Sequence, residues 1–177
     1  MRQTQKIVSP TSNEGRNTYV IKQVTDTLLK LLQVKPIDEI SISELCEKAL
    51  VGRASFYRNF NSKEDILRLY IHSLFQKWAT RSSQEEDKSL SALLRSLFSH
   101  FENHQDFYKI LSKRNLLYLL KDVLIDIYGP KPEYSKEEAY ARAYYVYALY
   151  GWIELWFKRG MKETSEEIEN MFKKQGL

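Results

Sequence analysis

The sequence has few of the residues that build disulfide-bonded or turn-rich folds. Its 177 residues include one cysteine, six glycines and four prolines. One cysteine cannot form an intrachain disulfide bond, which fits a reducing compartment. The scarcity of glycine and proline disfavours an all-β fold with many tight turns. The single cysteine, Cys46, lies in an apolar helical stripe, so we interpret it as a small core residue; the alternative is a reactive or metal-binding thiol.

Long apolar runs are also missing. No uninterrupted apolar stretch approaches the ~20 residues that a membrane-spanning helix needs. The first residues, MRQTQKIVSPTSNEG, are polar and lack the apolar core of a signal peptide. We therefore expect a cytoplasmic protein with no membrane partner.

The motifs of common enzyme classes are absent. The sequence contains no P-loop, no GxGxxG, no Ser-His-Asp order and no dense cluster of metal ligands. His100 and His104 are four residues apart, a spacing that can place two imidazoles on one metal ion, but no third ligand lies nearby in the sequence. We therefore expect a protein that is not an enzyme, with no cofactor and no catalytic or metal-binding residue.

The chain does have the apolar spacing of α-helices along most of its length. Ser41 and Glu44 have the spacing of a capping box at a helix start, and Thr164 and Glu167 have it again near the end of the chain. No segment shows the alternation of a strand, so the expected fold is all-α. Helices are predicted over about 17–34, 41–49, 53–60, 90–103, 105–113, 115–128, 136–159 and 165–175, with one more that is capped by Asn61 or Ser62 and runs to about Ser82.

Residues 41–63, SISELCEKALVGRASFYRNFNSK, carry the most informative pattern. Two short helices joined by a turn of three or four residues form the unit that inserts a helix into the major groove of DNA. In the first helix Ile42, Leu45, Cys46 and Ala49 make one buried stripe. In the second, Phe56 and Phe60 face inward and leave an outer face with basic and hydroxyl side chains.

Positive charge is concentrated in the same part of the chain. Residues 1–63 hold ten Lys and Arg against six Asp and Glu, whereas the remainder of the chain is neutral. A basic excess near the two-helix unit fits contact with a phosphate backbone. We expect residues 1–16 to be a flexible basic arm.

Residues 17–67 resemble the DNA-binding domain of the tetracycline-repressor (TetR) family of bacterial regulators. The resemblance rests on FYRNF at 56–60, on SKEDIL at 62–67 and on the upstream KPIDEISISELCEKA. A late segment, YGWIELWFKRGMKETSEEI, is similar to the last two helices of the family's regulatory domain. The resemblance implies an N-terminal three-helix DNA-binding domain with a helix-turn-helix at 17–65, and a C-terminal helical ligand-binding and dimerisation domain at 66–177.

The chemistry of the residues and the family resemblance together predict which face contacts DNA. Arginine can bind guanine edges or phosphates, a small alanine can touch a thymine methyl group, and hydroxyl groups suit phosphate oxygens. A lysine at a helix start adds its charge to the N-terminal backbone N–H groups. The nominated residues are Ser43, Arg53, Ala54, Ser55, Tyr57, Arg58, Asn59 and Lys63.

One position departs from the family pattern. The family usually has glycine where this chain has Leu50, because the turn needs a left-handed backbone there. A non-glycine residue in that conformation costs about 1–2 kcal/mol. We expect the Leu50-Val51-Gly52 turn to be re-formed around Gly52, with a changed angle of the helix that follows.

The C-terminal half is rich in aromatic residues on more than one side of a single helix, around 140–156. A helix with two apolar faces must bury both, and a second copy of the chain is the expected cover for one of them. The predicted dimer interface consists of Tyr145, Leu149, Trp152, Ile153, Trp156, Ile168 and Phe172. Aromatic residues also nominate an effector site, for which we select Phe98, Phe101, Tyr118, Tyr144 and Tyr147.

The resemblance implies a homodimeric transcriptional regulator that represses from a palindromic DNA operator and responds to an unidentified small-molecule effector. The alternative is a TetR-like coactivator or protein-interaction module with little DNA binding of its own.

Overall fold

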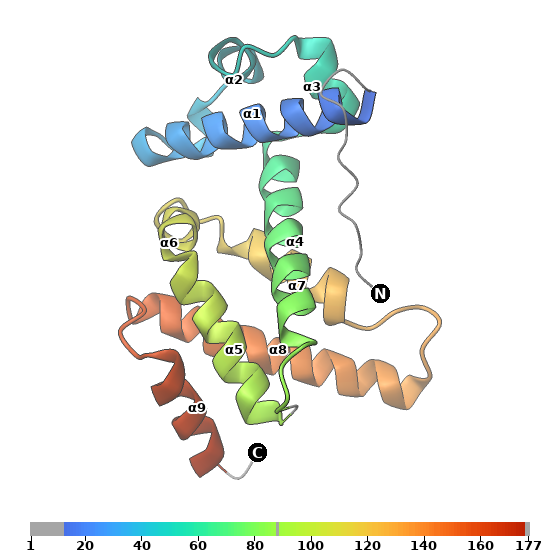
Figure 1. Cartoon of the computed structure of the whole chain (residues 1–177), viewed down its shortest axis with the longest axis vertical. Coiled ribbons are helices and arrows are strands. Elements are labelled where there is room, and N and C mark those ends of the chain that lie inside the picture. Colours follow the sequence, from blue (N-terminus) through green and yellow to red (C-terminus); the bar gives the residue numbers. More distant parts are fainter. Residues whose placement is uncertain (1–12, 88, 176–177) are drawn as a thin grey trace. The chain divides into compact units, whose positions relative to one another are not determined.

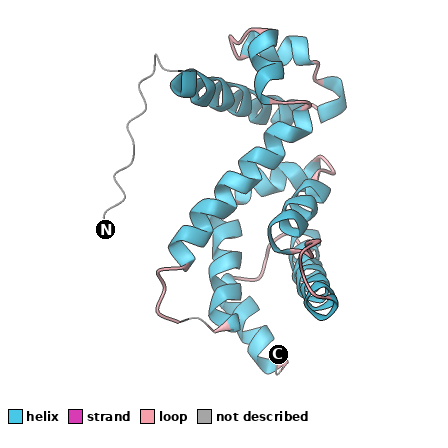
Figure 2. Cartoon of the chain, turned by 90° about the vertical axis from the view of Figure 1, so that its right-hand side faces the viewer, coloured by secondary structure: helices cyan, strands magenta, loops and turns pink. Residues whose placement is uncertain are grey.

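The structure is a computed structural model that describes residues 13–87 and 89–175. Within these ranges the chain is helical, with loops and turns between the helices and no strand (Figure 2). The all-α prediction is therefore confirmed. The chain divides into two compact units between Leu67 and Arg68, whereas the sequence placed the boundary after residue 65. The predicted basic arm lies outside the described residues, apart from residues 13–16, which are already helical and so not a flexible arm.

Unit 1 is a small three-helix assembly. Its elements are α1 (Asn13–Val34), a 3-10 turn η1 (Ile37–Glu39), α2 (Ile42–Lys48), α3 (Arg53–Asn59) and the first residues of α4 (Lys63–Ser82). The helix α1 packs against both α2 and α3, which lie on the same side of it (Figure 1). The core consists of fully buried apolar side chains from each element, including Val24, Leu28, Leu32, Ile40, Leu45, Phe56 and Phe60.

The start of α2 is capped, but not by the reciprocal box that the sequence predicted. The Ser41 hydroxyl oxygen accepts a hydrogen bond from the Glu44 backbone N–H at 3.0 Å. The Glu44 carboxylate, however, accepts from the Lys35 ammonium group at 2.6 Å and lies 3.4 Å from that of Lys48. A charge-assisted bond to an ammonium group is stronger than one to a neutral backbone N–H. Glu44 thus ties the end of α1 to α2.

Unit 2 contains the rest of α4 and five further helices. These are α5 (Leu90–Asn103), α6 (Gln105–Lys113), α7 (Leu117–Tyr128), α8 (Lys136–Lys158) and α9 (Ser165–Lys174), in close agreement with the predicted ranges. The helix α9 lies along α5, and α7 lies along α8. The core is largely aromatic, with Phe75, Phe98, Phe101, Tyr108 and Trp156 almost completely buried.

The last helix is attached to unit 2 by polar contacts at its start. The predicted capping box of Thr164 and Glu167 is complete. The Glu102 carboxylate, at the end of α5, accepts from the Ser165 backbone N–H at 2.7 Å and from its hydroxyl group at 3.0 Å. The Trp156 indole N–H donates to the Glu163 carbonyl oxygen at 2.8 Å. These bonds fix where α9 begins, and so they set its register on α5.

In the part of the chain that the structure covers, no helix is both long enough and apolar enough to cross a membrane.

Candidate nucleic-acid interface and ligand pocket

The turn between α2 and α3 is built on a left-handed residue, as the sequence implied. Leu50 has a φ of 54° and its side chain is 88% exposed. The Leu50 N–H donates to the Glu47 carbonyl oxygen, and the Val51 N–H donates to that of Cys46. This pair of bonds is the Schellman arrangement that ends helices, in which glycine usually holds the left-handed position. Leucine therefore fills a position where glycine would have no steric strain.

Gly52 does not take over that role, so the expectation of a re-formed turn was wrong. Its backbone is extended, with φ −65° and ψ 142°, and it serves as the N-cap of α3 without a side chain to cap it. The backbone N–H groups of Leu50 and Val51 already bond to carbonyl oxygens at the end of α2, so a second left-handed residue is not needed to satisfy them. Leucine is accommodated at position 50 because its side chain points into solvent.

Two buried aromatic side chains hold α3 on unit 1. Phe56 and Phe60 have exposed fractions of 0% and 2%, and their ring centroids lie 5.5 Å apart. The opposite side of the seven-residue helix is exposed: Arg53, Ala54, Tyr57 and Arg58 all lie at the surface. Tyr57 also makes an edge contact with Phe56, with centroids 5.3 Å apart, so its ring has a defined position while half of the side chain stays accessible.

Ser55 is the polar centre of this surface. Its hydroxyl group accepts from the Arg58 guanidinium group at 2.9 Å, and its carbonyl oxygen accepts from the Asn59 side-chain amide at 2.8 Å. The hydrogen bond that Arg58 donates to Ser55 orients the Arg58 side chain along the helix. One of the two Asn59 amide N–H groups is used within the helix itself, which leaves the other N–H group and the side-chain carbonyl oxygen for an outside partner.

Lys63 has a different position from the one that the sequence suggested. Its ammonium group donates to the carbonyl oxygens of Ile37 and Ile40, at 2.5 and 2.6 Å. Two of its three N–H groups therefore hold η1 and the residue after it against the start of α4. Ser43, in the first turn of α2, is exposed.

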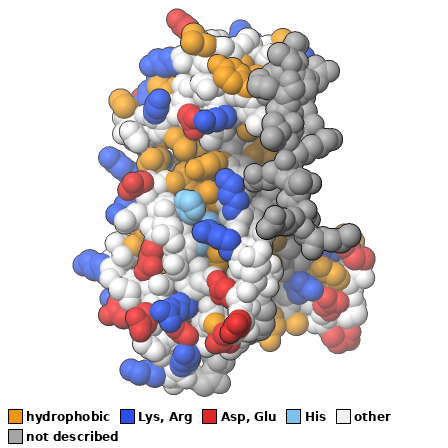
Figure 3. Space-filling model, viewed as in Figure 1, with side chains coloured by type: hydrophobic (Ala, Val, Ile, Leu, Met, Phe, Trp, Pro, Cys, Tyr) orange, Lys and Arg blue, Asp and Glu red, His pale blue; other side chains and the backbone are white. Residues whose placement is uncertain are grey.

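Charged side chains differ between the two units on the face drawn in Figure 3, where acidic groups lie mainly over unit 2. Net charge does not distinguish the two units, because residues 1–67 hold ten Lys and Arg against eight Asp and Glu, and residues 68–177 hold 17 against 15. The assignment of unit 1 to DNA therefore rests on the exposed side of α3 and not on net charge.

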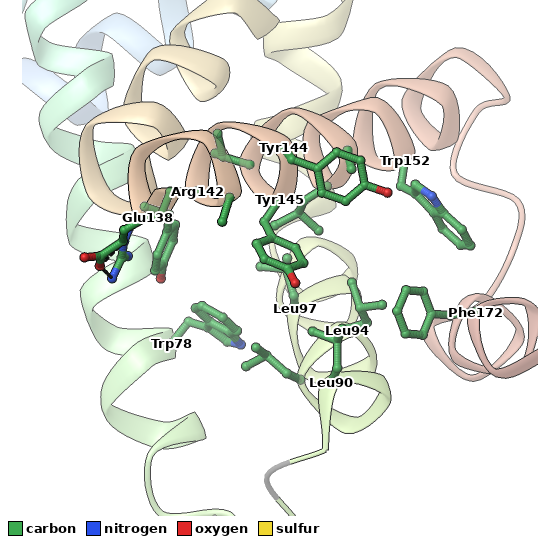
Figure 4. Close-up of a pocket in the computed structure, with 16 residues that line it drawn as sticks. Trp78, Leu90, Leu94, Leu97, Glu138, Arg142, Tyr144, Tyr145, Trp152 and Phe172 are labelled. Atoms are coloured by element: carbon green, nitrogen blue, oxygen red, sulfur yellow. Dashed lines mark hydrogen bonds and ion pairs between the residues drawn. The ribbon is translucent and has the colours of Figure 1, made fainter. Parts of the chain in front are cut away.

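A pocket of about 680 Å³ lies within unit 2, between α4, α5, the end of α7, α8 and α9 (Figure 4). Leucines from α5 and aromatic side chains from the other helices form most of its wall. The residues that line it are Trp78, Leu90, Leu93, Leu94, Leu97, Tyr128, Glu138, Ala141, Arg142, Tyr144, Tyr145, Val146, Ala148, Leu149, Trp152 and Phe172.

Of the five residues nominated for an effector site, Tyr144 lines this pocket. Phe98 and Phe101 are fully buried core residues, while Tyr118 and Tyr147 are exposed outside it. The leucines at 90, 93, 94 and 97 were visible in the sequence as one apolar face of a helix, yet nothing local distinguishes a face that lines a pocket from one that packs in a core.

Four of the seven predicted dimer residues need correction. Ile153, Trp156 and Ile168 are buried within unit 2, and Phe172 is 9% exposed, so these side chains have little or no surface for a partner. Tyr145, Leu149 and Trp152 line the pocket, together with Phe172. Tyr145 is also 63% exposed, so its predicted place in the interface stays open. A solvent-facing stripe of α8 consists of Tyr140, Tyr144, Tyr147, Gly151 and Leu155, all of them exposed.

The two groups considered for metal binding are structural. His100 is buried, with its Nε2 atom 3.1 Å from the Tyr108 hydroxyl oxygen. Burial lowers the pKa of His100 to about 4, with smaller contributions from His104 and Arg81. Burial likewise raises the pKa of the Cys46 thiol. Within residues 13–87 and 89–175 there is no group of three potential metal ligands.

Comparison with known proteins identifies both halves. The family model described as "Bacterial regulatory proteins, tetR family" matches residues 24–70, and one described as "Transcriptional regulator C-terminal region" matches residues 88–175. The chain is 26% identical over 136 residues to the uncharacterised HTH-type transcriptional regulator YuxN of Bacillus subtilis (strain 168). That match covers 63% of this chain and 47% of the relative, so it spans about half of the relative's length.

Two solved structures share the fold. Lin0861 from Listeria innocua superposes with a TM-score of 0.73 at 14% identity, over 97% of this chain and 96% of the other. A TetR transcriptional regulator from Streptococcus agalactiae 2603V superposes with a TM-score of 0.56 at 20% identity, over 90% and 94%. At these identities the likeness concerns the fold.

Proposed function

The chain belongs to the TetR family of bacterial transcriptional regulators, and from that premise we propose that it is a homodimeric, ligand-responsive repressor that reads a palindromic operator with α3. The observation that carries the proposal is the arrangement of buried and exposed side chains on α3. A short helix is held from behind by Phe56 and Phe60, and it presents arginine, alanine and tyrosine side chains to the outside.

The contacts of this surface follow from its chemistry. Arg53 and Arg58 can each donate two hydrogen bonds to a guanine edge or clamp a phosphate group. Ala54 allows a close approach to the base pairs, and the Tyr57 hydroxyl group suits a phosphate oxygen. Since Lys63 is held by backbone carbonyls, we assign it to the positioning of α4 and not to the first layer of DNA contacts.

A homodimer is supported by the exposed stripe of α8. Tyr140, Tyr144, Tyr147 and Leu155 are each more than half exposed, and together they form an apolar row that a monomer would leave in water. A side chain added at Gly151 would meet no atom of its own chain, so glycine here lets a partner helix come close. A two-fold dimer also matches two half-sites of a palindrome.

Ligand response is supported by the pocket in unit 2. A ligand changes DNA affinity only if it binds the DNA-competent and incompetent states with different affinities, and the two effects are then reciprocal. A pocket with walls from five helices, α4 among them, is a place where such a difference can arise.

The DNA-binding part is tested by gel shift with an operator selected from random sequence. Arg53→Ala and Tyr57→Ala are expected to weaken binding by about tenfold or more, because each removes a group with phosphate or base contacts worth ~1–3 kcal/mol. Tyr118→Ala is the matched control, since Tyr118 is a similarly exposed tyrosine in unit 2. If the two α3 variants bind as well as the control, the contact surface is misassigned.

A second function is favoured by the engagement of Lys63, which removes one cation from the DNA surface. The protein would then act as a coactivator with weak DNA binding of its own. The purified protein distinguishes the two: a repressor's affinity for its operator falls steeply with salt, because phosphate contacts release counterions. Specific binding at nanomolar concentration with a steep salt slope contradicts the coactivator.

A further inference from the structure

The pocket in unit 2 also restricts the kind of molecule that it can hold, and this inference rests on the proposed ligand response. Along α8 it extends from Glu138 to Trp152, which corresponds to about 21 Å of helix. Its volume of about 680 Å³ lies in the middle of the ~300–1,000 Å³ that small-molecule sites span. The pocket is therefore long as well as large.

Figure 4 shows how its two ends differ. Glu138 and Arg142 lie at the end next to α4, whereas Trp152 and Phe172 lie at the end next to α9, with ring centroids 6.0 Å apart. Tyr145 lies between these ends and directs its hydroxyl group towards α5. Apolar and aromatic side chains thus line the pocket from its middle to the α9 end.

The charged end is neutralised within the chain. Among the described residues that line the pocket, Glu138 and Arg142 are the charged ones. The guanidinium group of Arg142 donates from Nε to Glu138 Oε1 at 3.1 Å and approaches the same oxygen with Nη2 at 3.0 Å. Its Cζ atom also lies 4.5 Å from the centroid of the Tyr134 ring. Arg142 is therefore occupied on both its edge and its face.

A charged ligand has no free counter-charge in such a site. A carboxylate or an ammonium group that enters it gives up water without gaining an unpaired partner, and an uncompensated charge in an apolar site is strongly disfavoured. A neutral ligand loses only apolar contact with water, which favours binding. A hydroxyl or carbonyl group on the ligand has the phenol group of Tyr145 as a partner.

We propose that this pocket binds a neutral, elongated, apolar molecule, with no charged group and at most a hydroxyl or carbonyl group as its polar end. The ligand lies along α8, with its apolar length between the α5 leucines and the Trp152–Phe172 pair. The Glu138–Arg142 pair stays closed at the other end.

The test uses three probes with one decyl chain: 1-decanol below its solubility limit, and decanoate and decylammonium below their micelle-forming concentrations. Binding to the full chain, without DNA, is measured by isothermal titration calorimetry. Decanol is expected to bind at least about tenfold more tightly than either ion, a difference of ~1.4 kcal/mol. If decanoate binds most tightly and the Arg142→Gln variant loses this binding, the proposal is overturned. The pocket is then an anion site in which the ligand separates Arg142 from Glu138.

Two rim variants locate the binding. Ala141 and Ala148 are exposed and line the pocket, so Ala141→Phe and Ala148→Phe fill it from the rim without disturbing the core. Each is expected to weaken decanol binding about tenfold. Ala79→Phe, on an exposed part of α4 outside the lining, is the control and keeps wild-type affinity. Equal affinity in all three variants places the alkanol elsewhere and contradicts the assignment.

A second copy of the chain is the competing occupant. If decanol does not bind the wild type and Ala141→Phe converts a dimer to a monomer in light scattering, the groove is a subunit interface and the proposal fails. The outcome for the proposed function is separate. Operator binding without decanol binding rejects the ligand class alone, whereas decanol binding that does not release operator DNA rejects the ligand response alone.

Discussion

The ammonium group of Lys63 and the carbonyl oxygen of Ile40 are 2.6 Å apart, although 23 residues separate them in the chain. The same ammonium group also binds the Ile37 carbonyl oxygen. A lysine that would be assigned to DNA from its sequence alone thus closes the loop between α1 and α2 onto the start of α4. The Ile37 carbonyl oxygen also accepts from the Ile40 backbone N–H at 3.1 Å, so the contact of Lys63 matters most for the Ile40 carbonyl group.

This contact predicts a stability effect for Lys63→Met. The variant keeps the length of the side chain but removes the donor, and unfolding is expected to be easier by ~1–3 kcal/mol, as for other hydrogen bonds from charged groups. Thermal denaturation followed by circular dichroism measures the change. Lys48→Met is the control, because the Lys48 side chain is more exposed and pairs with Glu44 at 3.4 Å. If Lys63→Met loses DNA affinity while its stability is unchanged, Lys63 contacts DNA and does not stabilise unit 1.

The turn at Leu50 predicts a gain in stability for Leu50→Gly. Leucine at φ 54° is strained, and glycine removes the strain of ~1–2 kcal/mol at the expense of a more flexible unfolded chain. We expect a net stabilisation of about 1 kcal/mol and an unchanged operator affinity, because the hydrogen bonds of the turn are backbone bonds. Leu50→Ala keeps the strained Cβ and provides the comparison. An equal melting temperature for the glycine and alanine variants would show that the backbone is not strained.

Local patterns predicted the parts of the fold that depend on neighbours in the sequence. The helix ranges, the Phe56–Phe60 anchor and the Thr164–Glu167 capping box all involve residues three or four apart, and all are present. The family resemblance implied a left-handed backbone at position 50, and the structure has it there. The expectation that the turn re-forms around Gly52 was wrong, because that outcome depends on which α2 carbonyl groups are already bonded.

The remainder could not be predicted, because it depends on contacts between distant segments. The helix α8 is aromatic on several sides, so its periodicity does not say which side faces α5 and α9; Ile153 and Trp156 are inside, and Tyr140 and Leu155 are outside. The pocket also depends on contacts between distant segments, since its walls come from five helices spread over almost a hundred residues. The contact of Lys63 with Ile37 spans 26 residues.

His100 predicts a dependence of stability on pH. Its pKa is about 4 in the folded protein, below the usual value near 6.5, because the ring is buried next to Phe75 and Phe101 and close to His104. The unfolded state therefore binds more protons between these two values, and stability is lost as pH falls from about 6.5 towards 4. A difference of this size corresponds to a loss on the order of 3 kcal/mol.

The matched variant is His100→Phe, which keeps an aromatic ring but cannot titrate. Urea denaturation at a series of pH values is expected to show a steep loss below pH 6.5 in the wild type and a shallower one in the variant. The slope that remains includes His104, whose pKa is also lowered by partial burial. Identical pH profiles for both proteins would mean that His100 is not the titrating group.

The exposed stripe of α8 predicts the effect of charge on assembly. Leu155 is 59% exposed in the single chain, and in the proposed dimer its side chain is covered by the partner. Leu155→Glu would then bury a carboxylate without a counter-charge, which is strongly unfavourable. We expect the variant to be monomeric at micromolar concentration by light scattering, with an unchanged helical content. Its operator affinity should fall by more than tenfold, because one recognition helix then reads one half-site.

Leu69→Glu is the control, since Leu69 is a similarly exposed leucine of α4 outside the stripe, and it should remain dimeric. A dimer that survives Leu155→Glu but not Leu69→Glu would move the interface from α8 to α4.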